Sequence, residues 1–250
     1  MTDPALVRLD VADAVATVTL DSPANRNALS TSLVTSMMQH LNTLTGRTDV
    51  RAVVIAAAGP VFCAGADMRE AATEGMEAGA RALVALQRLI LSLDQPVAAR
   101  VHGPVRAGGL GILGACDVVI SADAVTFAFT EVLLGLAPAV ISLTTLPRLT
   151  SRGASETYLS GAGFDAHEAV RIGLVTRAVP AEQLDEAVAE VTSQWAGTSA
   201  QGLRETKALL NDSVLRRIDD LGEQVARQSA QLFASEEARA AMQAFLSRTR

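Results

Sequence analysis

The sequence predicts an α/β fold in which short strands alternate with helices through the first half of the chain. Apolar runs such as residues 50–58 are typical of buried strands. Residues 80–93 instead carry their apolar side chains at helical spacing. Because strands that alternate with helices pair in parallel through helical crossovers, we expect a mainly parallel sheet. From Leu136 onward the pattern becomes mostly helical.

The first expected elements are bounded by clear local signals. Residues 14–20 alternate small and branched side chains and predict a strand, which Asp21-Ser22-Pro23 ends. Ser30 is the expected N-cap of a helix that reaches about Leu44. Further strands are expected at 50–58, 96–101, 117–121, 126–129 and 173–179, and further helices at 80–93, 107–116, 142–149, 155–159, 166–171 and 181–195. Two more helices are expected from Ser199 and from about Ser213, with a break near Ser235.

Composition excludes several classes of function. The chain has 250 residues, of which 49% are hydrophobic, so it can bury a sizeable core. The net charge of −6 comes without a basic stripe and argues against nucleic acid as a partner. Cys63 and Cys116 lie in apolar surroundings and are expected to be buried free thiols, with no metal site. The N-terminus lacks an apolar signal core, and the longest uncharged run, 132–147, is shorter than the ~18 residues that suggest a membrane span, so we expect a cytoplasmic protein with no membrane partner.

The most informative stretch is the small-residue segment 105–117, which follows an apolar strand and a turn at His102-Gly103-Pro104. From Ala107 it predicts a helix buried on all sides. Glycines at a helix start let a ligand approach bare backbone, and the first N–H groups of a helix are unpaired. We therefore expect a site that attracts permanent or developing negative charge.

The same stretch also permits a different interpretation. Gly109-Leu-Gly111-Ile-Leu-Gly114 matches the dinucleotide-binding pattern G-x-G-x-x-G, with Glu131 downstream. Its mid-chain position and the helical character of the chain beyond residue 136 argue against a nucleotide site.

Two further places can carry chemistry. In Ala64-Gly65-Ala66-Asp67, Gly65 lets backbone pass close to a ligand and Asp67 can cap a following helix, although an ordinary strand-to-helix turn has the same pattern. Glu131 is the only charged residue between Asp123 and Arg148. Apolar surroundings raise the pKa of a carboxyl group and suit it to proton transfer, whereas a solvated acid at a strand end would have no such role.

Other polar residues near these segments give weaker indications. His40, His102 and His167 are scattered, and no G-x-S-x-G motif or Ser-His-Asp set supports nucleophilic catalysis. Arg106, close to the glycine segment, could contact a phosphate or be ordinary surface charge.

With these residues in place, the chain resembles the enoyl-CoA hydratase/isomerase (crotonase) superfamily over about residues 5–250. The matching pieces, in order, are Asn25-Arg-Asn-Ala-Leu-Ser30, Phe62-Cys-Ala-Gly-Ala-Asp67, His102-Gly-Pro-Val-Arg-Ala-Gly-Gly109, Cys116-Asp117 and Phe129-Thr-Glu-Val-Leu-Leu-Gly135. The resemblance displaces the dinucleotide interpretation. It implies a spiral of ββα units in residues 1–195 and a helical oligomerisation region in residues 196–250. It also implies homotrimers or hexamers.

The resemblance implies specific roles as well. The substrate is an acyl-CoA thioester, and coenzyme A enters as part of the substrate, so no separate cofactor is expected. The backbone N–H groups of Ala66 and Gly108 form the oxyanion hole, and Glu131 moves protons. The implied CoA contacts are Arg26, Ala28, Ala64, Ala66, Asp67, Met68, Arg69 and Gly108.

One position departs from the family pattern. Hydratases of the family carry two catalytic glutamates, and the first would fall at Gly111, which has no side chain. The run 135–142 nevertheless resembles hydratases of branched or unusual enoyl-CoAs, so we expect an enoyl-CoA hydratase of the lyase class, active in fatty acid metabolism, that uses Glu131 alone. The alternatives are a Δ3–Δ2 enoyl-CoA isomerase, an acyl-CoA-binding homologue with weak catalysis, and other reactions of the superfamily. His102 or Arg106 could assist Glu131.

Overall fold

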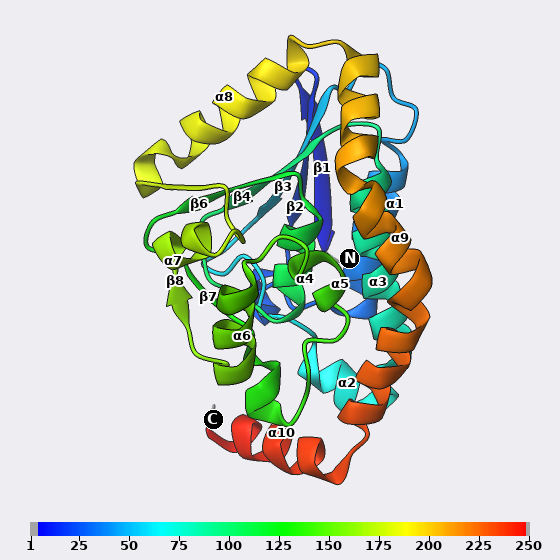
Figure 1. The fold of residues 1–250 in the computed structure, drawn as a ribbon, viewed down its shortest axis with the longest axis vertical. Coiled ribbons are helices and arrows are strands. Elements are labelled where there is room, and N and C mark those ends of the chain that lie inside the picture. Colours follow the sequence, from blue (N-terminus) through cyan, green and yellow to red (C-terminus); the bar gives the residue numbers. More distant parts are fainter. Residues whose placement is uncertain (1–4, 249–250) are drawn as a thin grey trace.

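A six-stranded sheet forms the centre of the protein, in a computed structural model that describes residues 5–248 (Figure 1). Its strand order is β1-β2-β3-β4-β6-β9. The strands are β1 (Val7–Ala12), β2 (Val15–Leu20), β3 (Ala52–Ala57), β4 (Val97–Val101), β6 (Val118–Ala122) and β9 (Arg177–Val179). From β2 to β9 all neighbours are parallel, which confirms the predicted pairing.

Strand β1 was not predicted. It pairs antiparallel with β2 at the edge of the sheet. Only Val7 of its six residues is buried. Its sequence nevertheless alternates Val7, Leu9 and Val11 with Arg8 and Asp10, which is the pattern of a half-buried strand, so the signal was present and was missed.

A second sheet of three short strands lies beside the first. It consists of β5 (Val105–Arg106), β7 (Thr126–Ala128) and β8 (Phe164–Asp165), in the order β5-β7-β8. The ring of Phe164 stacks on Phe127 and Phe129 at centroid distances of 5.8 and 6.0 Å. This aromatic cluster fixes the segment that leads to Glu131.

Most predicted helices are confirmed. The helices are α1 (Thr31–Asn42), α2 (Met68–Glu74), α3 (Glu77–Ser92), α4 (Gly108–Ala115), α5 (Ser142–Thr145), α6 (Ser151–Ser160), α7 (Ala166–Arg171), α8 (Leu184–Ala196), α9 (Ala200–Phe233) and α10 (Glu236–Arg248). The Ser30 hydroxyl accepts a hydrogen bond from the Leu33 N–H and caps α1, as predicted. Every residue of α4 is buried, which confirms the helix expected to be covered on all sides. Cys63 and Cys116 are buried free thiols, also as predicted.

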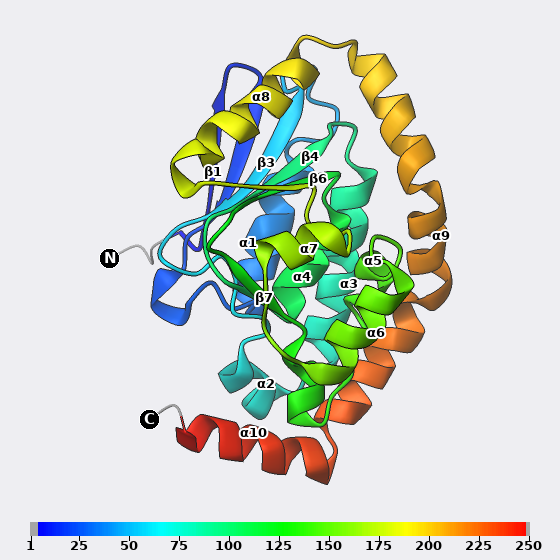
Figure 2. The ribbon, with the colours of Figure 1, turned by 60° about the vertical axis from the view of Figure 1, so that its left-hand side comes forward.

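The prediction of two helices from Ser199 and Ser213 was wrong, because α9 is continuous over 34 residues. It runs along one side of the molecule, with α10 across one end, in both views (Figures 1 and 2). Asn211-Asp212-Ser213 is a poor helical sequence. Tertiary contacts override this local preference, since Asn211 and Val214 are buried on the inward face of the helix. The predicted break near Ser235 is confirmed by the start of α10 at Glu236.

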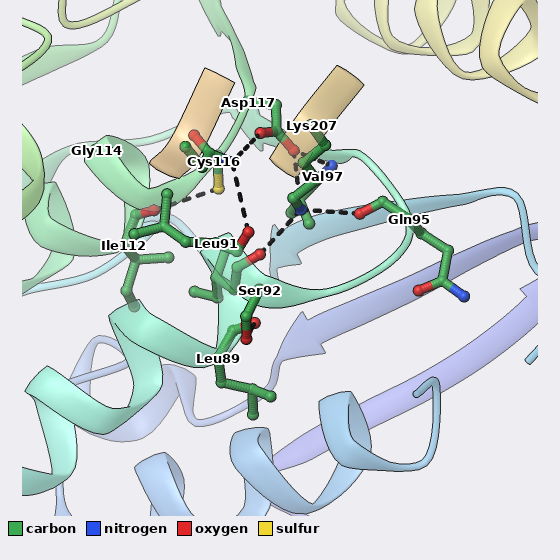
Figure 3. Close-up of polar contacts among 12 residues, drawn as sticks. Leu89, Leu91, Ser92, Gln95, Val97, Ile112, Gly114, Cys116, Asp117 and Lys207 are labelled. Carbon is green, nitrogen blue, oxygen red and sulfur yellow. Dashed lines mark hydrogen bonds and ion pairs between the residues drawn. The ribbon is translucent and has the colours of Figure 1, made fainter. Parts of the chain in front are cut away.

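A buried polar cluster fastens α9 to the sheet (Figure 3). The Lys207 ammonium group is 3.0 Å from Asp117 and donates to the carbonyl oxygens of Ile90 and Gln95. Asp117 also accepts from the Val97 N–H, at 2.8 Å, and from the Asn211 side chain, at 3.0 Å. The cluster thereby joins α9 to β4 and to the C-terminal end of α4.

Candidate active site

A cavity of about 210 Å³ lies at the N-terminal end of α4. Six parts of the chain build its wall: residues 29–34, residues 64–71, residues 75–83 at the start of α3, residues 107–108, the segment 130–141 and the C-terminal end of α9. Lining residues from the predicted site are Ala64, Ala66, Asp67, Met68, Gly108 and Glu131. Most of the remaining wall is apolar, so the cavity suits an acyl chain more than a polar ligand.

The backbone turns at Ala66 and Gly108 meet in this cavity, as predicted. A Cβ atom built on Gly108 would lie 3.9 Å from the Ala66 nitrogen. Gly65 permits this approach with a φ of +94°, and a Cβ on Gly65 would come within 2.9 Å of the Ala107 Cβ. A residue with a side chain at position 65 would therefore be strained and would push the two turns apart.

The Gly108 amide is presented by an unusual backbone conformation. Ala107 has φ 45° and ψ −119°, which a non-glycine residue rarely adopts. Such strain is typical of places where function fixes the backbone. Gly108 is the first residue of α4, so its N–H has no partner within the helix and lies at the positive end of the helix dipole.

Both amides are available to a ligand. Within residues 5–248, neither the Ala66 nor the Gly108 N–H donates a hydrogen bond. The amides next to them are engaged: the Asp67 N–H donates to the Leu29 oxygen, and the Ala107 N–H donates to the Ala128 oxygen. Two unpaired donors beside each other on a mostly apolar wall can stabilise an oxygen that becomes negative during a reaction.

Of the three carboxyl groups on the cavity wall, those of Asp67 and Glu70 bond to backbone N–H groups, and Glu131 supplies the third. It lies in a 3-10 helix, Thr130–Leu134, and its Oε2 atom is buried with no hydrogen-bond partner within the described part of the chain. Burial disfavours the charged form and raises the pKa of Glu131 to about 7. A carboxyl group that titrates near neutral pH can both accept and return a proton.

Aromatic packing holds the Glu131 segment in place. Phe129, two residues before Glu131, is fully buried, and its ring centroid is 4.3 Å from that of Tyr158 on α6. The Tyr158 hydroxyl is hydrogen-bonded to Thr145 on α5. The backbone before Glu131 is therefore fixed by two helices.

The predicted CoA contacts fall into two groups. Ala64, Ala66, Asp67, Met68 and Gly108 line the cavity, whereas Arg26, Ala28 and Arg69 do not. Arg26 is exposed, and its carbonyl oxygen accepts from the Ala64 N–H, so it lies beside the cavity wall. The Asp67 carboxylate accepts from the Arg69 and Glu70 N–H groups and caps α2, as expected. That any of the predicted residues contacts CoA stays a prediction.

His102 and Arg106, the two residues suggested to assist Glu131 in proton transfer, make their contacts elsewhere. His102 does not line the cavity, and its Nε2 lies 2.6 Å from the Gly59 oxygen. The Arg106 guanidinium donates to the backbone and side chain of Thr126. Neither residue is placed to assist proton transfer at Glu131.

Several cavity residues were missed by the sequence analysis. Helix α9 contributes Ser229 and Phe233, and the segment after Glu131 contributes Pro138 and Ile141. The period of α9 could have placed Ser229 and Phe233 on one face. Nothing in the sequence indicates what that face contacts.

No group of three or more residues that could hold a metal ion occurs within residues 5–248. Within the same residues, no helix is long and apolar enough to span a membrane.

Comparison with known proteins identifies the family. The family model described as enoyl-CoA hydratase/isomerase matches residues 10–250. The chain belongs to the enoyl-CoA hydratase/isomerase family. Enzymes of this family act on acyl-CoA thioesters. The glycines of α4 are therefore part of its buried packing, and the dinucleotide interpretation is set aside.

Individual relatives agree with this assignment. The chain is 44% identical to an enoyl-CoA hydratase from Mycobacterium avium of known structure, with a TM-score of 0.92, covering 98% of this chain and 97% of that one. A carnitinyl-CoA hydratase from the same species has a TM-score of 0.84 at 26% identity, with 98% and 97% covered. A protein of Mycobacterium leprae, named "Probable enoyl-CoA hydratase echA12", is 35% identical over 208 residues, which cover 78% of this chain and 71% of the relative. These likenesses confirm the predicted crotonase-like fold.

Proposed function

We propose that this family member is an enoyl-CoA hydratase that adds water reversibly to a trans-2-enoyl-CoA thioester. The observation that carries the proposal is the shared cavity of Glu131 and the two unpaired amides of Ala66 and Gly108. A carboxylate near a site for a developing oxyanion is what proton transfer beside a thioester requires.

The proposed reaction uses one carboxylate twice. Ionised Glu131 takes a proton from water while the water oxygen bonds to the β-carbon. The electron pair of the double bond moves through the α-carbon onto the thioester oxygen, which the Ala66 and Gly108 N–H groups stabilise as an enolate. Glu131 then returns the proton to the α-carbon, and the carbonyl re-forms. One such amide donor typically contributes ~3–4 kcal/mol to the transition state.

A second candidate function follows from the wall beside Gly111. Gly111 has no side chain, and Ile141 lies against it. Of the two positions that carry catalytic glutamates in hydratases of the family, only Glu131 therefore supplies a carboxyl group. One carboxyl group suffices for a Δ3–Δ2 enoyl-CoA isomerase, in which Glu131 would move a proton between the α- and γ-carbons.

The test is turnover of crotonyl-CoA and longer trans-2-enoyl-CoAs by the wild type, Glu131→Gln and Glu70→Gln. Glu70 also lines the cavity, but its carboxylate is hydrogen-bonded to Thr31, so its variant is a matched control. We expect Glu131→Gln to lose at least 100-fold in kcat, an order-of-magnitude figure for general acid–base catalysis, and Glu70→Gln to keep activity. Equal activity of Glu131→Gln and the wild type would exclude the mechanism.

The same substrates separate the two reactions. Hydration yields a 3-hydroxyacyl-CoA. Isomerisation of a trans-3-enoyl-CoA in deuterated water moves the double bond without adding oxygen. Tight binding of CoA thioesters with neither product would instead identify an acyl-CoA-binding homologue.

The proposal includes self-association into a homotrimer or hexamer. Large apolar side chains on the surface support it: Leu133, Leu159, Leu209 and Leu210 are each more than 60% exposed. Light scattering of the purified protein would measure the assembly, and a monomer at micromolar concentration would contradict it.

A further inference from the structure

Helix α9 forms one part of the cavity wall. Ser229 and Phe233, one helical turn apart, line the wall there. Ala226, on the same inward face, packs against Ala80 and Val140. Through this face, α9 packs against the first half of α3.

The side chain of Leu83 lies between this part of the wall and the backbone of Gly108. It packs against the cluster of Ala80, Val140 and Ala226. On its other side, its Cδ2 would be 3.4 Å from a Cβ on Gly108. The face of α9 that carries Ala226 and Ser229 therefore lies across Leu83 from Gly108. If the thioester oxygen binds at Gly108, this face is where the acyl chain beyond its reacting carbons would lie.

The Ser229 hydroxyl has no partner within the described residues. The residue is 8% exposed and lines the cavity, and no hydrogen bond of its side chain occurs within residues 5–248. Other buried hydroxyls on helices bond back to their own helix: Thr157 donates to the Gly153 oxygen at 2.7 Å, and Thr192 donates to the Val188 oxygen at 3.1 Å. The Ser229 oxygen is open to the cavity, since it is not among the buried polar atoms that lack a partner, so it is free to hydrogen-bond a ligand there.

The other polar side chains of the wall are accounted for. Thr31 and Glu70 bond to each other, and Asp67 caps α2. The Thr130 hydroxyl lies next to Glu131 in the chain, at the reacting end. Ser229 is thus the unbonded hydroxyl that α9 adds to the wall, as far as the described residues line it, and Met76, Gly79 and Ala80 line the same cavity.

We propose that Ser229 is a specificity-determining residue, which hydrogen-bonds an oxygen, hydroxyl or carbonyl, carried by the acyl chain beyond its α- and β-carbons. This proposal rests on the proposed function, since it takes the cavity to bind an acyl-CoA thioester. A hydroxyl can donate to a carbonyl and accept from an alcohol, so both substituents fit. A site with a buried hydrogen-bonding group discriminates against a ligand that leaves the group unpaired.

The experiment measures binding of saturated thioesters, which cannot react. Calorimetry would compare hexanoyl-CoA with 4-oxohexanoyl-CoA, 5-oxohexanoyl-CoA and 5-hydroxyhexanoyl-CoA, for the wild type and Ser229→Ala. We expect the preference for at least one oxygenated ligand over hexanoyl-CoA to fall about fivefold in Ser229→Ala, the value of one net hydrogen bond. Ser229→Thr, which keeps a hydroxyl, should retain the preference. Ser213→Ala, an exposed position on the same helix, should bind like the wild type.

The outcomes distinguish this inference from the proposed function. An unchanged preference in Ser229→Ala, or an equal loss for all four ligands, would overturn the role of Ser229 even if the wild type hydrates trans-2-hexenoyl-CoA. Failure of the wild type to bind any of the four thioesters would overturn both proposals.

Discussion

Ile141 occupies the space beside Gly111. A Cβ atom on Gly111 would lie 2.7 Å from the Ile141 Cγ2 and 3.2 Å from the Gln87 side-chain oxygen. The position at which family hydratases carry their first glutamate is thus closed by packing as well as empty of a side chain. This relationship leaves Glu131 as the sole acid of the proposed mechanism.

The contact gives a first prediction. Gly111→Ala should lower the free energy of unfolding by about 1–3 kcal/mol, because the added methyl group overpacks the buried wall. Combining it with Ile141→Ala, which removes the contacting Cγ2, should cost less than the sum of the two single changes by about 1 kcal/mol. Urea denaturation of the four proteins measures this coupling. Strict additivity would mean that the two residues do not touch.

The pKa of Glu131 predicts the pH dependence of activity. Burial raises this pKa to about 7, and the proposed reaction starts from the ionised carboxylate. We therefore expect kcat/KM for hydration to increase as the pH rises through about 7 and then to level off. Initial rates of hydration measured across this pH range would show the rise in kcat/KM. A profile that is flat from about pH 5 to 8 would show that Glu131 is not the titrating base.

The same shift predicts how stability depends on pH. Between its ordinary pKa of 4.5 and the folded value of about 7, the folded protein keeps a proton that the unfolded chain has released. The free energy of unfolding therefore decreases through this interval as the pH rises. Glu131→Gln removes this penalty, so its stability relative to the wild type should increase by about 3 kcal/mol from pH 4 to pH 8. Urea titrations at the two pH values measure it, and an equal difference at both would contradict the burial of Glu131.

Local signals made much of this fold and site predictable. The caps at Ser30 and Asp67, the buried α4 and the isolated charge of Glu131 all depend on residues within a few positions of each other. The approach of Ala66 to Gly108 was expected only through the family resemblance, because no local pattern relates the two turns.

Other features depend on contacts between distant segments. Ser229 lines the cavity because α9 returns to α3. The continuity of α9 through Asn211 depends on Asp117, which lies 94 positions away in the chain. Propensity and periodicity carry no information about such partners.

Gly65, between two residues of the cavity wall, and Gly79, which lines it, give a matched pair of variants. Gly65→Ala should lower the free energy of unfolding by about 2–4 kcal/mol, since its φ of +94° and its 2.9 Å approach to the Ala107 Cβ both exclude a side chain. It should also lower kcat, because Ala66 would move away from Gly108. Gly79→Ala, inside α3, meets only the Met76 sulfur at 3.6 Å and should be neutral or stabilising by up to about 1 kcal/mol. Thermal unfolding and steady-state rates test the pair, and equal effects would contradict the proposed strain at Gly65.

The buried pair of Lys207 and Asp117 gives the last prediction. Their side chains are 4% and 13% exposed, so Lys207→Met leaves a largely buried carboxylate without its cation. We expect a loss of about 3–5 kcal/mol in the free energy of unfolding. Arg88→Met breaks the half-exposed pair with Asp219 on the same helix α9 and should cost less than about 1 kcal/mol. Adding Asp117→Asn to Lys207→Met should recover part of the loss, because the uncompensated charge is gone. A Lys207→Met protein as stable as the Arg88→Met control would show that the ion pair does not fasten α9 to the sheet.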